Sequence, residues 1–259
     1  MDYKTALQCA RLSKDVYQGF ADIKFEKWPG AEPVLVDKGS TDTQLAVLED
    51  PSAQLAVIVF RGSDADKDWE INLQQGTREQ DWTPEEKREK KEDVKEMVTD
   101  SKEMVYPATY GEPSRPVKMH SGFISAYLSV RDEIHRQIAQ SSATRYIVTG
   151  HSLGGALATL CAVDLQYNFG DRISIEAYTF GSPRVGNAAF AESYNQRVPD
   201  TWRVVNGWDA VVGLPAPWQG YRHVEIAQKL ERKFTWRIIT GSFSEHRIDN
   251  YIEALKERA

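Results

Sequence analysis

Ser152 lies in a stretch of sequence that suits nucleophilic catalysis. Residues Gly150 to Gly154 read Gly-His-Ser-Leu-Gly, which fits the pattern G-x-S-x-G. A short apolar, β-rich run (146–148) precedes the pattern, and an apolar helical pattern (156–161) follows it. A sharp strand-to-helix turn exposes the serine hydroxyl, and the flanking glycines let strand and helix pass without a Cβ clash. We therefore predict a nucleophile at Ser152. The alternative is a glycine-rich corner whose serine has no chemical role.

A serine nucleophile also needs donors for the negative oxygen that develops on its substrate. Leu153 would begin the helix that follows the turn, so its backbone N–H points toward such an oxygen. The second donor in hydrolases with this turn comes from a loop after an earlier central strand. Ser63 follows the apolar run 54–60 and stands at that place. Ser63 could also cap the next helix, and the two roles are compatible.

The base and acid that must accompany the serine can be narrowed by position. Among the five histidines, three are poor candidates. His120 and His135 lie upstream of the serine, and the side chain of His151, next to it, is expected to point away. In the chain order Ser, Asp, His, the acid should lie on a loop after a strand beyond the turn. Asp209 satisfies this requirement.

Two late histidines, His223 and His246, remain as candidates for the base. His246 is favoured because it lies at the start of the last predicted helix, with Ser244 as the expected N-cap, and catalytic groups commonly occupy such loops. His223 lies in an alternating strand pattern, where a hydrogen-bonded structural histidine is the ordinary interpretation. A helix N-terminus disfavours imidazolium, which suits a base that must be neutral before attack. Asp209 would then stabilise the cation formed during attack.

Helical and strand patterns alternate along most of the chain and predict an α/β fold with a mostly parallel sheet. The run LAVIVF, the second of two strands expected near the N-terminus, is typical of a strand buried on both faces. Residues 29–39 are expected to be a looser stretch. The predicted elements are, in order, a helix over 3–18, strands over 44–49 and 54–60, a helix within 119–140, the strand and helix around Ser152, a strand over 173–180, a helix over 187–195, a strand from 201, a hairpin-like pair over 220–227 and 233–240, and a last helix with apolar stripe Ile248, Tyr251, Ile252 and Leu255.

Two segments after Ser63 are unusual in composition. Within 65–73, Trp69 and Leu73 share one helix face and Ile71 lies opposite. This short amphipathic helix could serve as a lid over the site or could simply pack against the domain. Residues 79–105 hold ten acidic and six basic side chains, which predicts a long, solvated helix.

Composition restricts the function classes. A net charge of −6 and a pI near 5.5 argue against nucleic acid as a partner, because phosphate binding needs a basic face. No signal peptide and no run of 18 apolar residues is present, so we expect a soluble chain, either cytoplasmic or a processed secreted form. Cys9 and Cys161 are expected to be buried free thiols. No metal or cofactor is expected.

Several blocks together resemble the class 3 lipases, the fungal-type triacylglycerol lipase family of the α/β-hydrolases. They are GHSLGGALATL, VIVFRGSDADKDWEINL, HSGFISAYLSV, YTFGSPRVGNAAF, RVVNGWDAVVGLP, and YRHVEI followed by HRIDNYIEAL. The resemblance implies an α/β-hydrolase fold, with a central mostly parallel sheet flanked by helices, that hydrolyses triacylglycerol through an acyl-enzyme. It further implies a catalytic Ser152, Asp209 and His246, oxyanion donors at Ser63 and Leu153, and a lid over about 64–76 that includes Trp69, Ile71 and Leu73.

The sequence departs from this family in three places. The charged segment of about 79–117 is longer than the usual connection, Val212 replaces a frequent proline after the acid, and the paired cysteines of secreted fungal members are missing. We expect one domain over 1–259, a monomer, and a lipid or other ester substrate that can lie at an oil–water interface. The alternatives are a phospholipase A1, a feruloyl-type esterase, or a lipase-like binding module that has lost its chemistry.

Overall fold

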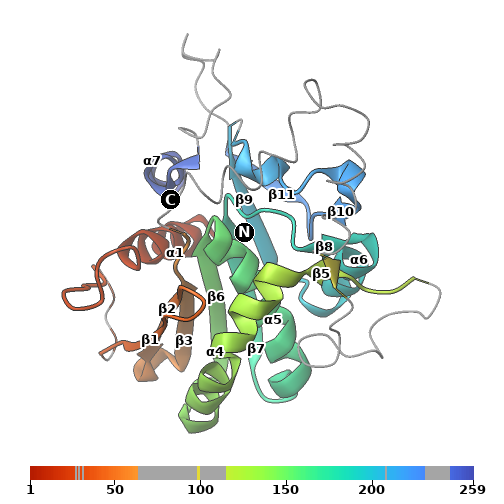
Figure 1. Cartoon of the computed structure of the whole chain (residues 1–259). Coiled ribbons are helices and arrows are strands. Elements are labelled where there is room, and N and C mark those ends of the chain that lie inside the picture. Colours follow the sequence, from red (N-terminus) through yellow and green to blue (C-terminus); the bar gives the residue numbers. More distant parts are fainter. Residues whose placement is uncertain are drawn as a thin grey trace.

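The central element of the computed structural model is a seven-stranded sheet in the order β1-β2-β3-β6-β7-β9-β11 (Figure 1). The structure describes residues 1–26, 28, 30, 32–63, 98–99, 115–207, 209–230 and 246–259. The strands from β3 to β11 run parallel, and β1 and β2 are antiparallel at one edge. The strands of this sheet are β1 (Val34–Lys38), β2 (Thr43–Asp50), β3 (Leu55–Phe60), β6 (Arg145–His151), β7 (Ser174–Phe180), β9 (Thr201–Asn206) and β11 (Ala227–Leu230).

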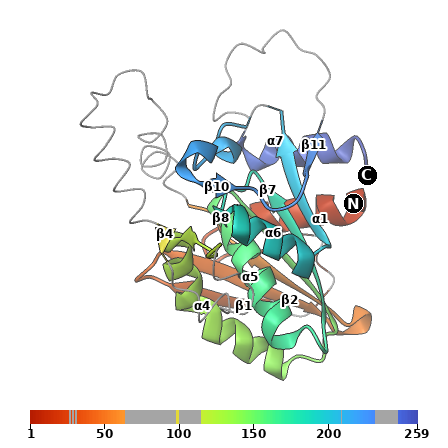
Figure 2. The same cartoon turned by 90° about the vertical axis from the view of Figure 1, so that its right-hand side faces the viewer.

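Helices cover both faces of this sheet. One face carries α4 (Ser121–Gln140), α5 (Leu153–Phe169) and α6 (Ala188–Arg197), and the other carries α1 (Tyr3–Asp15) and α7 (Ile248–Lys256). Figure 2 shows α4 and α1 on opposite sides of the sheet. The strand β3 supplies side chains to both faces, since Ile58 and Phe60 join the α4–α5 core while Val57 and Val59 join the α1–α7 core. The prediction of a strand buried on both faces is thus confirmed.

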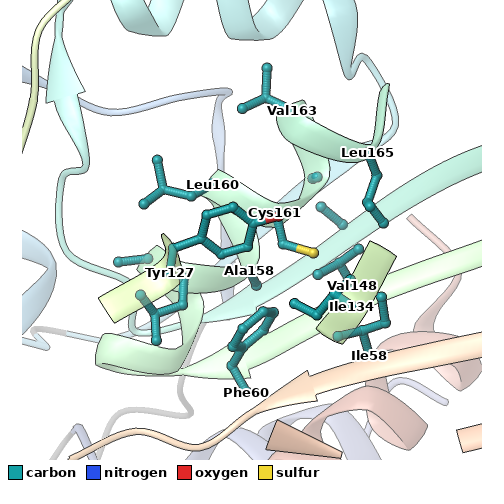
Figure 3. Packing of buried hydrophobic residues seen from close by; sticks show 14 of the residues in the cluster. Ile58, Phe60, Tyr127, Ile134, Val148, Ala158, Leu160, Cys161, Val163 and Leu165 are labelled. Atoms are coloured by element: carbon teal, nitrogen blue, oxygen red, sulfur yellow. The ribbon is translucent and has the colours of Figure 1, made fainter. Parts of the chain in front are cut away.

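The helix α5 is buried on all sides from Gly154 to Leu165, and most of these residues are apolar, as expected for a helix enclosed by its neighbours. Figure 3 shows Leu160 and Cys161 of this helix packed with Tyr127 of α4 and Phe60 of β3. Both cysteines are buried and free, as the sequence predicts. Within the described part of the chain, no helix combines the length and apolarity needed to cross a membrane.

A second, small sheet has the order β10-β8-β5-β4. Its strands are β4 (Val98–Thr99), β5 (Met119–His120), β8 (Gly186–Asn187) and β10 (Tyr221–Arg222). In β4, Val98 pairs with His120 and Thr99 with Met119. The expected long helix over 79–105 is therefore wrong at these two positions, where β-branched residues extend a sheet edge instead. The rest of that charged segment and the proposed lid residues Trp69, Ile71 and Leu73 lie outside the described residues.

Three further expectations need correction. Residues 34–38, expected to be part of a looser stretch, form edge strand β1. The first half of the expected hairpin divides between the two sheets, because β10 pairs with β8 whereas β11 runs parallel to β9. The second half, 233–240, lies outside the described residues. The N-cap of α7 is Arg247 rather than Ser244.

A buried carboxylate fastens α4 to α5. Asp164 of α5 has no exposed surface, and it accepts a hydrogen bond from the hydroxyl of Tyr127 at 2.6 Å. Arg131 donates to it at 3.1 Å, and Nε2 of His135 lies 2.7 Å away. These contacts lie in the second half of α5, away from the turn at its N-terminus that holds Ser152.

Removing that carboxylate should destabilise the whole fold. In Asp164→Ala, Arg131 and the Tyr127 hydroxyl lose a buried partner, so the free energy of unfolding in urea should fall by about 3–5 kcal/mol. The control is Glu133→Ala, which removes a more exposed carboxylate that pairs with Arg136 on the same helix and should cost less than about 1 kcal/mol. Equal losses in the two variants would show that Asp164 is not a buried anchor.

Stability should also depend on pH through three histidines, of which His151 is buried and His120 and His223 are half-buried. Burial lowers the pKa of His151 and His223 to about 3 and that of His120 to about 4. Each is then neutral in the folded state but protonated in the unfolded state below about pH 6.5, so its contribution is lost as pH falls toward the folded pKa. Asp15 has the opposite effect on stability. Burial raises its pKa to about 6, so below that pH the folded state binds a proton that the unfolded state does not yet bind.

Between pH 6 and 4 the unfolded state should therefore bind about two more protons at these four positions than the folded state. The free energy of unfolding should fall by about 3 kcal/mol per pH unit in this window. Urea unfolding at half-unit steps of pH measures the slope, and His223→Gln should remove about one proton from it. A free energy of unfolding that does not change between pH 6 and 4 would contradict the lowered pKa values of the three histidines.

Candidate active site

Ser152 occupies the turn between β6 and α5 with φ +58° and ψ −128°, a conformation that residues other than glycine rarely adopt. The backbone around it holds this geometry in place. The N–H of Ser152 donates to the carbonyl of Phe180 at 2.9 Å, and the N–H of Gly155 donates to the carbonyl of Ser152 at 2.9 Å. A strained backbone that its surroundings maintain is characteristic of functional positions.

The two glycines of the G-x-S-x-G pattern are needed for close packing. A Cβ atom added to Gly150 would lie 2.3 Å from the carbonyl oxygen of Gly154. One added to Gly154 would lie 2.4 Å from the carbonyl oxygen of Phe60 at the end of β3. Neither position has room for a side chain, so the strand, the turn and the helix approach each other as the sequence predicts.

Asp209 and His246 form a buried pair. Nδ1 of His246 lies 2.8 Å from Oδ2 of Asp209, and these residues are 4% and 7% exposed. The backbone N–H of Val211 donates to Oδ1 of Asp209 at 2.9 Å. Nε2 of His246 is buried and has no hydrogen-bond partner among the described residues. A histidine oriented by a carboxylate through one ring nitrogen, with the other nitrogen available, is the arrangement of a general base.

This pair lies beside the turn of Ser152. The register of the parallel strands places His151, Phe180 and Val204 in one row at the carboxyl ends of β6, β7 and β9. Gly181, with φ +60°, follows Phe180, and a Cβ atom on it would lie 2.8 Å from both Oδ2 of Asp209 and Nδ1 of His246. The backbone that accepts the Ser152 N–H therefore also supports the acid–base pair.

The two predicted oxyanion donors lie on adjacent elements. Ser63, half-buried, follows β3, and Phe60 at the end of β3 pairs with Gly150 of β6. Leu153 is the first residue of α5, so its N–H lies in a helical turn where amides have no intrahelical acceptor. The closeness of Gly154 to the carbonyl of Phe60 brings these two chain segments into contact.

The other histidines have different environments. Nε2 of His223 lies 2.7 Å from the carbonyl oxygen of Val212, and burial lowers its pKa to about 3. His223 therefore supports the loop after Asp209 rather than contacting the carboxylate. His151 does not point away from the site as expected, since its ring lies 4.5 Å from the ring of His246 between centroids.

Two tyrosines that contact this site were not recognised in the sequence. The hydroxyl of Tyr251 donates to Oδ2 of Asp209, the same oxygen that His246 contacts. Tyr251 belongs to the apolar stripe predicted for the last helix, and the burial of that stripe is confirmed. The hydroxyl of Tyr17 lies 3.0 Å from Nδ1 of His151. Helical spacing identified Tyr251 as core and did not single out Tyr17, and it carries no signal for the atom that a hydroxyl will reach.

Comparison with known proteins agrees with this geometry. The family described as Lipase (class 3) matches residues 57–218, more than half of the chain. A secreted mono- and diacylglycerol lipase of Fusarium solani is 39% identical over 109 residues, which are 40% of this chain and 32% of that protein. The lipase of Rhizomucor miehei is 32% identical over 189 residues, which are 70% of this chain and 43% of that protein. The chain thus spans less than half the length of these curated relatives.

A solved structure extends the similarity to the fold. A triacylglycerol lipase whose catalytic centre is described as a serine protease triad is 26% identical, with a TM-score of 0.64. The match covers 88% of this chain and 80% of that one. The predicted α/β-hydrolase fold is confirmed by this neighbour together with the mostly parallel sheet flanked by helices. The chain belongs to the class 3 lipase family.

Proposed function

We propose that this chain is a serine hydrolase that cleaves carboxylic esters of lipids, with acylglycerols as its substrates. The observation that carries the proposal is the buried Asp209–His246 pair, in which Nε2 of His246 has no hydrogen-bond partner among the described residues. Membership of the class 3 lipases and the names of the relatives support the choice of substrate.

In the first half of the reaction, Oγ of Ser152 attacks the ester carbonyl carbon while Nε2 of His246 takes the hydroxyl proton. The carbonyl electron pair moves onto oxygen, and the N–H groups of Ser63 and Leu153 hold the resulting oxyanion. The bond to the alcohol then breaks, and His246 returns its proton to the leaving alkoxide. The product of this half-reaction is an acyl ester on Ser152.

Water completes the cycle through the same groups. His246 removes a proton from the water as its oxygen attacks the acyl carbon. The second tetrahedral intermediate then collapses, the bond to Oγ of Ser152 breaks, and Oγ takes the proton back from His246, which releases the carboxylic acid. Asp209 stabilises the imidazolium formed in each half-reaction. Hydrogen bonds from Tyr251 and from the N–H of Val211 keep its oxygens aligned with His246. No step requires a metal or cofactor.

We further propose that residues 1–259 form one domain that acts as a monomer, with the segment of about 64–76 as its lid. Trp69, Ile71 and Leu73 would present apolar surface to a lipid phase when this lid opens. A lid that opens only at an oil–water interface would make hydrolysis depend on that interface. The charged segment of about 79–117 would enlarge or replace this cover.

The assignment of the three catalytic residues predicts a specific pattern of losses. Ser152→Ala and His246→Ala should each lower kcat for a soluble ester by at least ~10⁴-fold, because the triad acts as a unit. A fluorophosphonate probe should label wild-type protein and should not label Ser152→Ala. His223→Gln, which can still donate to the carbonyl of Val212, should retain activity.

Two other outcomes of this experiment would contradict the proposed roles. If His223→Gln lost activity while His246→Ala retained it, the assignment of His246 as the base would be wrong. Absence of both hydrolysis and labelling in the wild type would favour a binding module over an enzyme.

The substrate class predicts how the rate responds to an interface. Hydrolysis should rise steeply when a triacylglycerol or diacylglycerol emulsion forms above the solubility limit, because the lid then opens. A series of p-nitrophenyl esters from short to long acyl chains, measured on both sides of that limit, tests this. A preference for soluble aromatic esters without any rise would indicate a feruloyl-type esterase, and a preference for phospholipid vesicles would indicate a phospholipase.

A further inference from the structure

Two side chains outside the proposed triad form a continuous bridge toward it. Tyr17 follows α1, and its hydroxyl lies 3.0 Å from Nδ1 of His151 at the end of β6. On the far side of the ring, Nε2 of His151 lies 2.6 Å from the carbonyl oxygen of His246. The bridge therefore joins the first helix of the chain to the backbone of the proposed base.

The direction of each hydrogen bond in the bridge follows from its last acceptor. A carbonyl oxygen can only accept, so Nε2 of His151 carries the proton and donates to His246. In a neutral imidazole Nδ1 is then the acceptor, and the hydroxyl of Tyr17 donates to it. Burial, together with the neighbouring His246, lowers the pKa of His151 to about 3. The ring therefore stays neutral, with the same donor and acceptor, throughout the neutral pH range.

The same tyrosine also touches the oxyanion side of the site. A Cβ atom added to Gly62 would lie 2.0 Å from the hydroxyl oxygen of Tyr17 and 2.8 Å from the carbonyl oxygen of His151. Gly62 immediately precedes Ser63, one of the proposed oxyanion donors. The guanidinium of Arg61 lies 5.9 Å from the centre of the Tyr17 ring. One hydroxyl group thus contacts both the backbone before Ser63 and the ring that holds His246.

We propose that Tyr17 and His151 are positioning residues that set the backbone of His246 at a fixed place relative to Gly62 and Ser63. This role rests on the proposed hydrolase function. His246 precedes α7 by two residues, so its carbonyl is bound by a side chain rather than by a strand partner. Proton transfer and oxyanion binding must be aligned at one reacting carbon, and a displacement of 1 Å costs about 10²-fold in rate.

A pair of amide substitutions separates positioning from simple packing. The side-chain nitrogen of Gln lies as many bonds from Cβ as Nε2 of histidine, so His151→Gln keeps a donor for the carbonyl of His246. The amide of Asn corresponds instead to Nδ1, so His151→Asn keeps a partner for Tyr17 but loses the donor to His246. Both variants remove the imidazole. Asn is smaller than Gln by one methylene, and the same pair of substitutions at a second histidine measures the effect of that difference.

The controls are the same two substitutions at His135, which bonds Asp164 on α5 rather than any group of the proposed site. Steady-state kinetics on a soluble p-nitrophenyl ester, thermal unfolding, and the rate of fluorophosphonate labelling are measured for all four variants and for Tyr17→Phe. The labelling rate reports attack by Ser152 without any contribution from deacylation.

His151→Asn should lower kcat and the labelling rate by about 10²-fold with KM within about twofold of the wild type. His151→Gln should restore kcat to within about tenfold, and Tyr17→Phe should fall between these two. The His135 variants should lose stability without any change in kcat. Equal losses in His151→Asn and His151→Gln, or losses that track the unfolding temperature across both pairs, would overturn the positioning role while leaving the hydrolase intact. A wild type that neither hydrolyses esters nor reacts with the probe would overturn the hydrolase and the positioning role together.

Discussion

The most demanding requirement of this structure is the burial of the Asp209 carboxylate. A charge removed from water is costly unless the protein replaces its hydration with directed donors. Three such donors converge on Asp209: Nδ1 of His246, the hydroxyl of Tyr251 and the backbone N–H of Val211. They come from the last helix, the segment just before it, and the loop after β9. The position of α7 against the sheet is therefore coupled to the position of the carboxylate.

A second constraint is the lack of space at the carboxyl ends of the strands. Gly150, Gly154 and Gly181 each lie where a Cβ atom would overlap neighbouring backbone or the Asp209–His246 pair. Gly150 lies near the carboxyl end of β6, Gly181 directly follows β7, and the backbone of Gly154 packs against Gly150 and Phe60. Small residues at this edge therefore determine how closely nucleophile, base and acid can approach.

The sequence was most informative where local pattern and tertiary environment agree. The LAVIVF run, the turn at Ser152 and the apolar helix after it were readable because buried parallel strands and enclosed helices have distinctive compositions. Edge strands do not. Strand β1 is largely exposed, and β4 has only two residues. Neither therefore shows an apolar run or an apolar–polar alternation that stands out from the polar sequence around it. The split between β10 and β11 was hidden because adjacent strands in sequence usually pair, whereas here each joins a different sheet.

The residues of the candidate site also differ in how far the sequence could predict them. Ser152 and Asp209 were accessible from motif and chain order, and the choice of His246 over His223 followed from its place next to a helix. Tyr251 was recognised only as a core residue, His151 only as a neighbour of Ser152, and Tyr17 was not singled out. Their roles depend on contacts between segments that are more than 90 positions apart in two of the three cases. Periodicity reports which face of a helix is buried. It does not report which oxygen on that face meets a distant carboxylate or imidazole.

The contact between α1 and α7 has a consequence for the order in which the protein is made. The two helices pack on the same face of the sheet and are linked by an ion pair between Lys14 and Asp249. Tyr17 follows the first of them, and His246 and Tyr251 belong to the segment of the second. During translation the turn of Ser152 emerges from the ribosome before His246 and Tyr251 have been synthesised. A nascent chain that ends before α7 therefore lacks two of the three donors that hold Asp209, so the site proposed for catalysis is complete only after the last helix has docked.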